Sequence, residues 1–325
     1  MHPAFSVIFL TTLIGAGQGL FLALYTGQVY SVFNLVPGQS SHTFYGYGSL
    51  LALIFLVLGL ISSVFHLGRP ERAWRSAAMW RTSWLSREVI VLPAFMGMTF
   101  LYGVAHFMDY NPMLFSISDV FNVNLTLLLG AMATALAFLL FLCTGMIYAC
   151  IKFLQEWATP LTVLNYTLLG AASGFTLATV FASYAGIQLA HFYAGWAIIL
   201  TSIAFVTRMA SLVRNSRIKP KSTMSSAIGI RHTKIQQKSR GFMAGSFNTR
   251  EYFHNMPSIW FKSIKWVFPV LTFVLPVIIL SSGMESNSFA IYTFAFVIQY
   301  VGLIAERWFF FAQANHPQNL YYQTI

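Results

Sequence analysis

The sequence predicts an all-α polytopic membrane protein with eight transmembrane helices. Hydrophobic residues make up 57% of the 325 residues and charged residues only 8%, a balance that excludes an ordinary soluble enzyme. The apolar residues form eight runs, each close to or above the ~20 residues that a helix needs to cross a bilayer. All nineteen Lys and Arg residues fall on alternate connections between these runs. We therefore expect residues 1–325 to form a single eight-helix membrane domain.

The spans follow one another in order along the chain. Backbone N–H and C=O groups must pair within their own segment in lipid, so each run is expected to be a helix. The expected spans are 5–33, 45–66, 87–108, 121–151, 160–182, 191–213, 265–283 and 288–310. The first run lacks a preceding basic residue and is too long for a signal-peptide core, so we expect it to be retained.

Two pairs of glycines mark places where helices are expected to approach each other. Gly15 and Gly19 lie four residues apart in the first span. Gly170 and Gly174 repeat this spacing in the fifth span. Small residues at this spacing let helix backbones pack closely in membranes, so both pairs predict tight helix contacts.

The basic residues predict the orientation in the membrane. Five arginines lie between the second and third spans, Lys152 follows the fourth, twelve basic residues surround the link between the sixth and seventh, and Arg307 ends the eighth. With eight crossings these connections share one face, which the positive-inside rule places in the cytoplasm together with both termini. We therefore expect a multi-pass protein of a bacterial inner membrane. The net charge of +11 then reflects loops near anionic lipid, not nucleic-acid binding.

The longest of these connections is the cytoplasmic link at 214–262. Its apolar residues are interspersed with basic ones and include Ile228, Ile230, Ile235 and Phe242. This pattern is consistent with an amphipathic helix on the membrane surface, and a disordered linker is the alternative.

Ionisable residues are absent from the centres of the predicted spans. Only Gln18 and Gln299 bring strong polarity there. Secondary transporters usually hold their substrate near the midplane of the bilayer, so this pattern argues against transport. The polar chemistry is expected instead at the cytoplasmic edge of the membrane.

His66 ends the second span and Glu88 starts the third, and a short loop joins these antiparallel helices. Both residues are therefore expected at one depth, where they could face each other. An imidazole and a carboxyl group can hold a quinone oxygen and move its protons. The alternative is structural. The helix dipole would stabilise the Glu88 carboxylate near the helix N-terminus, where Ser86 would be the N-cap, and His66 would donate a hydrogen bond to a loop carbonyl. Arg69 is a candidate for orienting the headgroup or docking a partner.

The loop between these spans combines Trp74, Trp80 and Trp84 with five arginines. Arginine binds carboxylates through two parallel hydrogen bonds, which favours docking of an acidic partner. Tryptophan at a membrane interface is also typical of an anchoring belt. Both interpretations remain open from the sequence.

A haem group would require two histidines that face each other inside the helices. His106 and His191 both lie near the outer face, so an outer haem is an alternative, although structural roles are favoured. No paired cysteine motif is present. We therefore expect no iron–sulfur cluster and no other metal site built from spaced ligands in this chain.

Four blocks of the sequence, in order, resemble the DmsC family of membrane anchor subunits. They are residues 66–74, 82–88, 241–253 and 306–322. The resemblance implies a complex of three subunits. A molybdenum catalytic subunit and a ferredoxin-like subunit with four iron–sulfur clusters dock on an anchor that binds quinone and holds no haem. The quinol-site histidine and glutamate of the family correspond to His66 and Glu88 in this sequence.

The family includes dimethyl sulfoxide reductase anchors, which consume quinol, and sulfite dehydrogenase anchors, which deliver electrons to ubiquinone or menaquinone. The family-like blocks share the face that is predicted to be cytoplasmic, as expected for the sulfite-oxidising members. We therefore favour a sulfite dehydrogenase anchor, with a menaquinol-oxidising dimethyl sulfoxide reductase anchor as the alternative. A passive anchor and a transporter are the remaining hypotheses.

Overall fold

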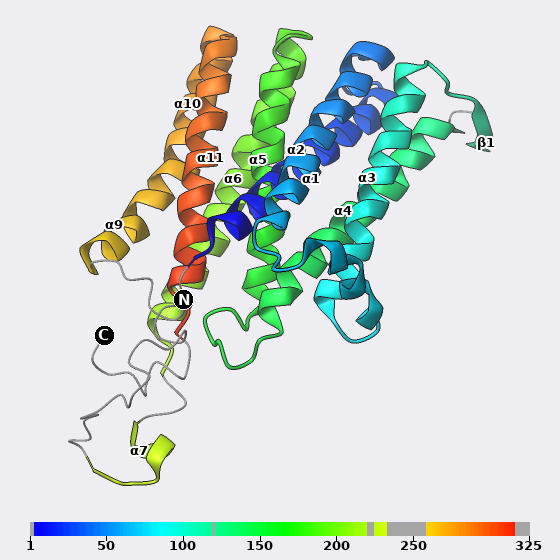
Figure 1. Ribbon diagram of the computed structural model, residues 1–325. Coiled ribbons are helices and arrows are strands. Elements are labelled where there is room, and N and C mark those ends of the chain that lie inside the picture. Colours follow the sequence, from blue (N-terminus) through cyan, green and yellow to red (C-terminus); the bar gives the residue numbers. More distant parts are fainter. Residues whose placement is uncertain (1–2, 119–120, 220–223, 233–257, 316–325) are drawn as a thin grey trace.

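The computed structural model describes residues 3–118, 121–219, 224–232 and 258–315. Within these ranges, eight helices are long and apolar enough to cross a membrane. They run side by side through one bundle (Figure 1). The predicted fold class, an all-α polytopic membrane protein, is confirmed.

The helices follow the predicted spans closely. The first four crossings are α1 (Phe5–Val32), the π-helix η1 (Ser41–Gly46) continued by α2 (Tyr47–Val64), α3 (Trp84–Phe107) and α4 (Leu125–Ala149). The last four are α5 (Pro160–Ala182), α6 (Ile187–Ser216), α9 (Ser258–Pro269) continued by η3 (Val270–Val274) and α10 (Leu275–Ser286), and α11 (Phe289–Ala312). The shorter elements are the 3-10 helix η2 (Pro70–Met79) and α7 (Met224–Ile228).

The fourth span begins later than predicted, at Leu125 and not at 121. The preceding residues form an antiparallel hairpin of β1 (Met113–Ser118) and β2 (Phe121–Asn124). The Asn111 side-chain carbonyl accepts hydrogen bonds from the backbone N–H and the hydroxyl of Thr126, both at 3.0 Å. These bonds satisfy donors in the first turn of α4 and fix its start.

The seventh crossing, by contrast, begins earlier than predicted, at Ser258 and not at 265. Its middle is the π-helical segment that follows Pro269, whose ring nitrogen has no N–H to donate. The amphipathic helix suggested for the long link is not testable over Ile235 and Phe242, which lie outside the described residues. Of that link the structure describes residues 214–219, residues 224–232, which include α7, and residues 258–262.

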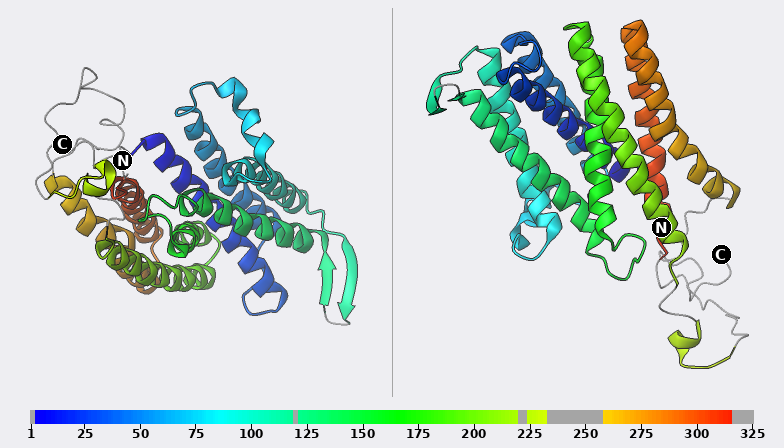
Figure 2. Two further views of the ribbon diagram at one scale, coloured as in Figure 1. Left: turned by 90° about the horizontal axis from the view of Figure 1, so that it is seen from below. Right: turned by 180° about the vertical axis from the view of Figure 1, so that it is seen from behind.

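The described basic residues gather toward one end of the bundle. This end, called the basic end below, carries η2, the α4–α5 connection, α7, the beginning of α1 and the last turns of α11 (Figures 1 and 2). The β hairpin and the α5–α6 and α10–α11 turns lie at the opposite end. Alternate connections therefore lie at the same end of the bundle, as the positions of the basic residues in the sequence predicted.

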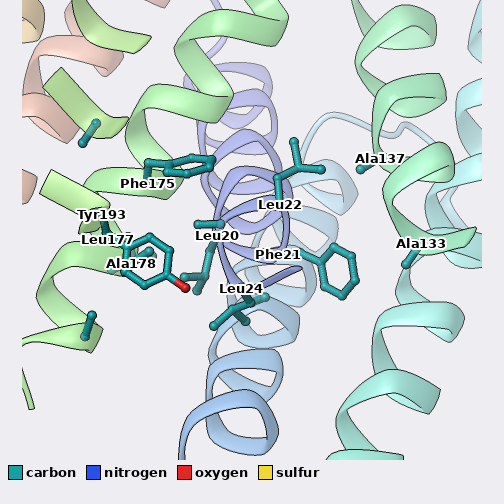
Figure 3. Close-up of a cluster of buried hydrophobic side chains, with 14 of the residues drawn as sticks. Leu20, Phe21, Leu22, Leu24, Ala133, Ala137, Phe175, Leu177, Ala178 and Tyr193 are labelled. Carbon is teal, nitrogen blue, oxygen red and sulfur yellow. The ribbon is translucent and has the colours of Figure 1, made fainter. Parts of the chain in front are cut away.

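Helix α1 lies at the centre of the bundle and contacts α2, α4, α5 and α11. Its Leu20, Phe21 and Leu24 are fully buried. Figure 3 shows Phe21 directed toward Ala133 of α4, while Leu20 lies on the side of Tyr193. Because α1 is covered on several sides, it needs apolar residues all round and shows no polar face.

The predicted close contact between the glycine pairs is confirmed, because α1 and α5 meet at these residues. A Cβ added to Gly19 would lie 2.2 Å from the carbonyl oxygen of Gly170. A Cβ on Gly174 would lie 2.0 Å from the carbonyl carbon of Gly19. The two backbones are therefore in direct contact, which only glycine permits here.

Candidate functional site

Glu88 lies in the second turn of α3 and turns toward α4. Its carboxylate accepts a hydrogen bond from the hydroxyl of Thr144. The N-cap of α3 is Ser83, whose hydroxyl accepts from the backbone N–H of Ser86 at 3.3 Å. The suggested Ser86 cap is therefore wrong, and the Glu88 side chain is used for a contact between helices.

His66 lies two residues beyond the end of α2. Its backbone N–H donates to the carbonyl of Ser63 at 3.3 Å, which closes a turn. Its side chain is exposed, as is that of Arg69. Neighbouring protein atoms still remove part of the imidazole hydration, which lowers the pKa of His66 below its ordinary value. The neutral imidazole is therefore the favoured form near neutral pH.

The structure does not join His66 to Glu88. Across the described residues, no hydrogen bond or ion pair connects the two side chains. Glu88 is directed into the bundle, whereas His66 stays at the surface of the basic end. Their shared position at one end agrees with the expectation of equal depth, but the direct pairing of the two side chains is not present.

A small polar cavity lies between α1, α3, α4, α5 and α11. It encloses about 20 Å³. Its polar lining comes from Thr11, Thr12, Gln18, Glu88, Thr144, Tyr166, Ser173 and Arg307. A buried water needs roughly 10–15 Å³ and two to four polar partners, so the cavity suits water. Engineered cavities that admit benzene are of the order of 150 Å³, so a quinone ring does not fit.

An ionic cluster is buried beside this cavity. Arg208 Nε of α6 lies 2.6 Å from Glu306 Oε1 of α11, and both side chains are 1% exposed. Arg307 Nε lies 3.3 Å from the other oxygen of Glu306. The Cζ atom of Arg307 is also 3.7 Å from the ring centroid of Tyr166, a cation–π contact.

The sequence interpretation missed this cluster. It treated Arg208 and Arg307 as residues that flank the spans, whereas the structure buries both. The available signal was the Glu306–Arg307 pair inside the apolar run of the last span. Ionisable residues within membrane helices usually face the bundle interior and pair with one another.

The loop between α2 and α3 exposes tryptophan and arginine together. Trp74 is 71% exposed and Trp80 is 53% exposed. Arg87 closes the loop, because its guanidinium donates to the carbonyls of Trp80 at 3.0 Å and Arg81 at 2.7 Å and stacks over Trp84. The Arg87 side chain is thus engaged within the loop, whereas Arg69 and the indole rings of Trp74 and Trp80 are exposed.

The two histidines considered for an outer haem have separate partners. His106 Nδ1 hydrogen-bonds the Ser41 hydroxyl at 2.8 Å. His191 Nε2 lies 2.7 Å from the side-chain oxygen of Asn287, which joins α10 to α11. In Figures 1 and 2, α10 and α3 stand at opposite edges of the bundle, so the structure does not bring these histidines together.

These features define a polytopic membrane protein whose described basic residues are concentrated at one end. The sequence matches the family model of the DMSO reductase anchor subunit (DmsC) over residues 1–312. The chain therefore belongs to the DmsC family of membrane anchor subunits, as the four sequence blocks indicated. It is also 54% identical to a sulfite dehydrogenase subunit of Allochromatium vinosum over 325 residues, which cover 100% of both chains.

Proposed function

We propose that this chain is the quinone-reactive anchor of a sulfite dehydrogenase with three subunits in a bacterial inner membrane. Support comes from its DmsC family membership and from its similarity to a sulfite dehydrogenase subunit. Sulfite and water yield sulfate, two protons and two electrons at the molybdenum of a catalytic partner. The electrons pass through an iron–sulfur partner to a quinone, which takes up two protons to become quinol.

The single observation that carries the quinone assignment is the position of Glu88. A carboxylate is held inside the bundle by Thr144, next to a polar cavity, on the helix adjacent to the exposed His66. This arrangement supplies a proton-exchanging group in the interior and a hydrogen-bond donor at the surface of the same end. A carboxylate with only a structural role would not require a cavity beside it.

The size of the cavity argues against a headgroup position inside the bundle. Because a quinone ring does not fit beside Glu88, the headgroup is assigned to the His66 side of α3. Phe65 and Leu67, which flank His66, are exposed at 81% and 37% and provide apolar surface for the ring and tail. His66 donates to a quinone oxygen, Arg69 assists its orientation, and Glu88 supplies a proton.

The partner subunits are assigned to the basic end. Trp74 and Trp80 are exposed there beside several arginines, a combination enriched in the centres of protein interfaces. An acidic surface of the iron–sulfur partner would pair with these arginines and bring its nearest cluster close to His66. By the positive-inside rule this end is cytoplasmic.

The decisive experiment uses the complete complex of all three subunits in membrane vesicles. In His66→Ala, sulfite-dependent quinone reduction is expected to be lost. Sulfite oxidation with a soluble acceptor that takes electrons directly from the partner subunits should remain, which shows that the complex still assembles. His191→Ala, at the opposite end of the bundle, is the matched control. Full quinone reduction by His66→Ala would overturn the assignment.

The second candidate is a DMSO reductase anchor, which the name of the matching family favours. Electrons would then flow from quinol to the partner subunits. Assays with sulfite and with dimethyl sulfoxide, in vesicles of each orientation, separate the two directions. Sulfite oxidation only where the basic end is accessible supports the first proposal, whereas quinol-driven dimethyl sulfoxide reduction supports the second.

A further inference from the structure

We propose that the polar cavity is a water-filled compartment for proton transfer, in which Arg307 is the positioning residue for the Glu88 carboxylate. This inference rests on the proposed function and extends it. It assigns a role to the buried cluster of Arg208, Glu306 and Arg307, and it gives the Glu88 proton a path through the bundle that does not run through His66.

The first step is that the cavity is built to hold water. Its volume of about 20 Å³ exceeds the space needed by one water molecule. Hydroxyl, amide, carboxylate and guanidinium groups line it, including those of Thr11 and Gln18 from α1 and Ser173 from α5. Such groups supply the two to four partners that a buried water requires.

The second step is the fixed orientation of Arg307. Glu306 engages its Nε, and the Tyr166 ring covers one face of its guanidinium. A guanidinium carries five N–H donors, so the terminal nitrogens can still donate to water in the cavity that Arg307 and Glu88 both line.

The third step is charge balance. Arg208, Glu306 and Arg307 together carry one excess positive charge in a buried site. Burial of an uncompensated charge is costly, and an ionised Glu88 on the same cavity compensates it. Arg307 therefore stabilises the carboxylate form that remains after Glu88 has released its proton.

The proton transfer balances in atoms and charge. The iron–sulfur partner supplies two electrons to the quinone. The O–H bond of the Glu88 carboxyl group breaks as its proton passes to water, and a relay through water ends in a new O–H bond on the reduced quinone. The second proton arrives on the His66 side. The Glu88 carboxylate then takes a proton from cavity water, and that water receives a proton in turn from the aqueous phase at the basic end.

The test measures the pH profile of sulfite-dependent quinone reduction in the complete complex. Glu88→Gln identifies the component of the profile that belongs to Glu88. In Arg307→Gln this component should move to higher pH by about one unit or more, because the opposite charge that favoured the carboxylate is gone. Arg307→Lys should restore most of the native midpoint. An unchanged midpoint in Arg307→Gln would overturn the proposal.

A second pair of variants avoids any change of charge. Thr11→Val removes a cavity hydroxyl without changing side-chain size, and it should slow turnover and increase the solvent isotope effect. Thr167→Val makes the same replacement on α5 outside the cavity, where the hydroxyl bonds only to the Val163 carbonyl, and should leave both unchanged. Native kinetics in Thr11→Val would contradict a proton path through the cavity.

The two proposals fail in different ways. If the native complex does not reduce quinone, or if His66→Ala keeps full activity, the proposed function is wrong. If His66→Ala and Glu88→Gln behave as expected while the Arg307 and Thr11 variants keep native pH profiles and rates, only the proton compartment is wrong.

Discussion

Arg208 and Glu306 form an ion pair of 2.6 Å between α6 and α11, with each side chain only 1% exposed. Arg307 pairs with the same carboxylate, so two guanidinium groups share one carboxylate. Desolvation of three charges is expensive and is repaid only while the set remains complete. The cluster therefore makes the packing of the last helix dependent on a single carboxylate.

The first prediction is that Glu306→Gln strongly destabilises the protein. The substitution removes the carboxylate that both buried guanidinium groups contact, and breaking a buried pair in this way costs about 3–5 kcal/mol. The free energy of unfolding can be measured by denaturant titration in detergent micelles. Glu285→Gln, at an exposed acid near the end of α10, is the control and should change stability little. Equal stability of both variants would show that the cluster is not important for folding.

A second prediction concerns the contact between α1 and α5. Gly174→Ala places a methyl group 2.0 Å from the backbone of Gly19, so the helices must separate. Overpacking of this kind costs roughly 1–3 kcal/mol. Gly97→Ala is the matched control, because a Cβ there meets no atom within 4 Å. The thermal unfolding midpoint in micelles should fall for the first variant and not for the second.

The spans and the glycine contact were predictable because they depend on local patterns. The length of an apolar run determines whether it can cross a bilayer, and small residues four apart determine close approach. The hairpin before α4 was not predicted, because its alternating residues are few and follow directly on an apolar run. The start of α4 is set by hydrogen bonds that Thr126 donates to Asn111, a residue well before the helix in the chain.

The candidate site was predictable only in part, for a related reason. The sequence places His66 and Glu88 at one membrane edge, and the structure keeps both at that end. Which helix face meets which neighbour depends on the packing of the whole bundle. The contact of Glu88 with Thr144 and the burial of Arg208 against Glu306 join residues far apart in the chain, so neither follows from local spacing.

A third prediction is that Glu88→Gln slows quinone turnover and flattens its pH dependence. Glutamine keeps the size of the side chain and can still accept from Thr144, but it does not exchange a proton. Rates of sulfite-dependent quinone reduction across a pH series would measure the effect, at matched amounts of assembled complex. Loss of a general acid or base typically lowers the rate by ~100-fold or more when proton transfer limits it.

Thr144→Val provides the matched comparison for that experiment. It removes the hydrogen bond to the carboxylate but leaves the titratable group in place, so a pH-dependent rate should persist. If Glu88→Gln retained the native rate and pH profile, Glu88 would be reduced to a structural link between α3 and α4.

The fourth prediction is that His66 titrates below the ordinary imidazole value of about 6.5. Partial loss of hydration disfavours the charged imidazolium and lowers its pKa. The unfolded chain then binds this proton at higher pH than the folded one, so the stability linked to His66 is complete above pH ~6.5 and declines as the pH falls. NMR of isotope-labelled histidine in micelles, assigned by comparison with His66→Gln, gives the midpoint directly. A midpoint at or above 6.5 would show that the imidazole is fully hydrated and that the neutral form is not favoured by its surroundings.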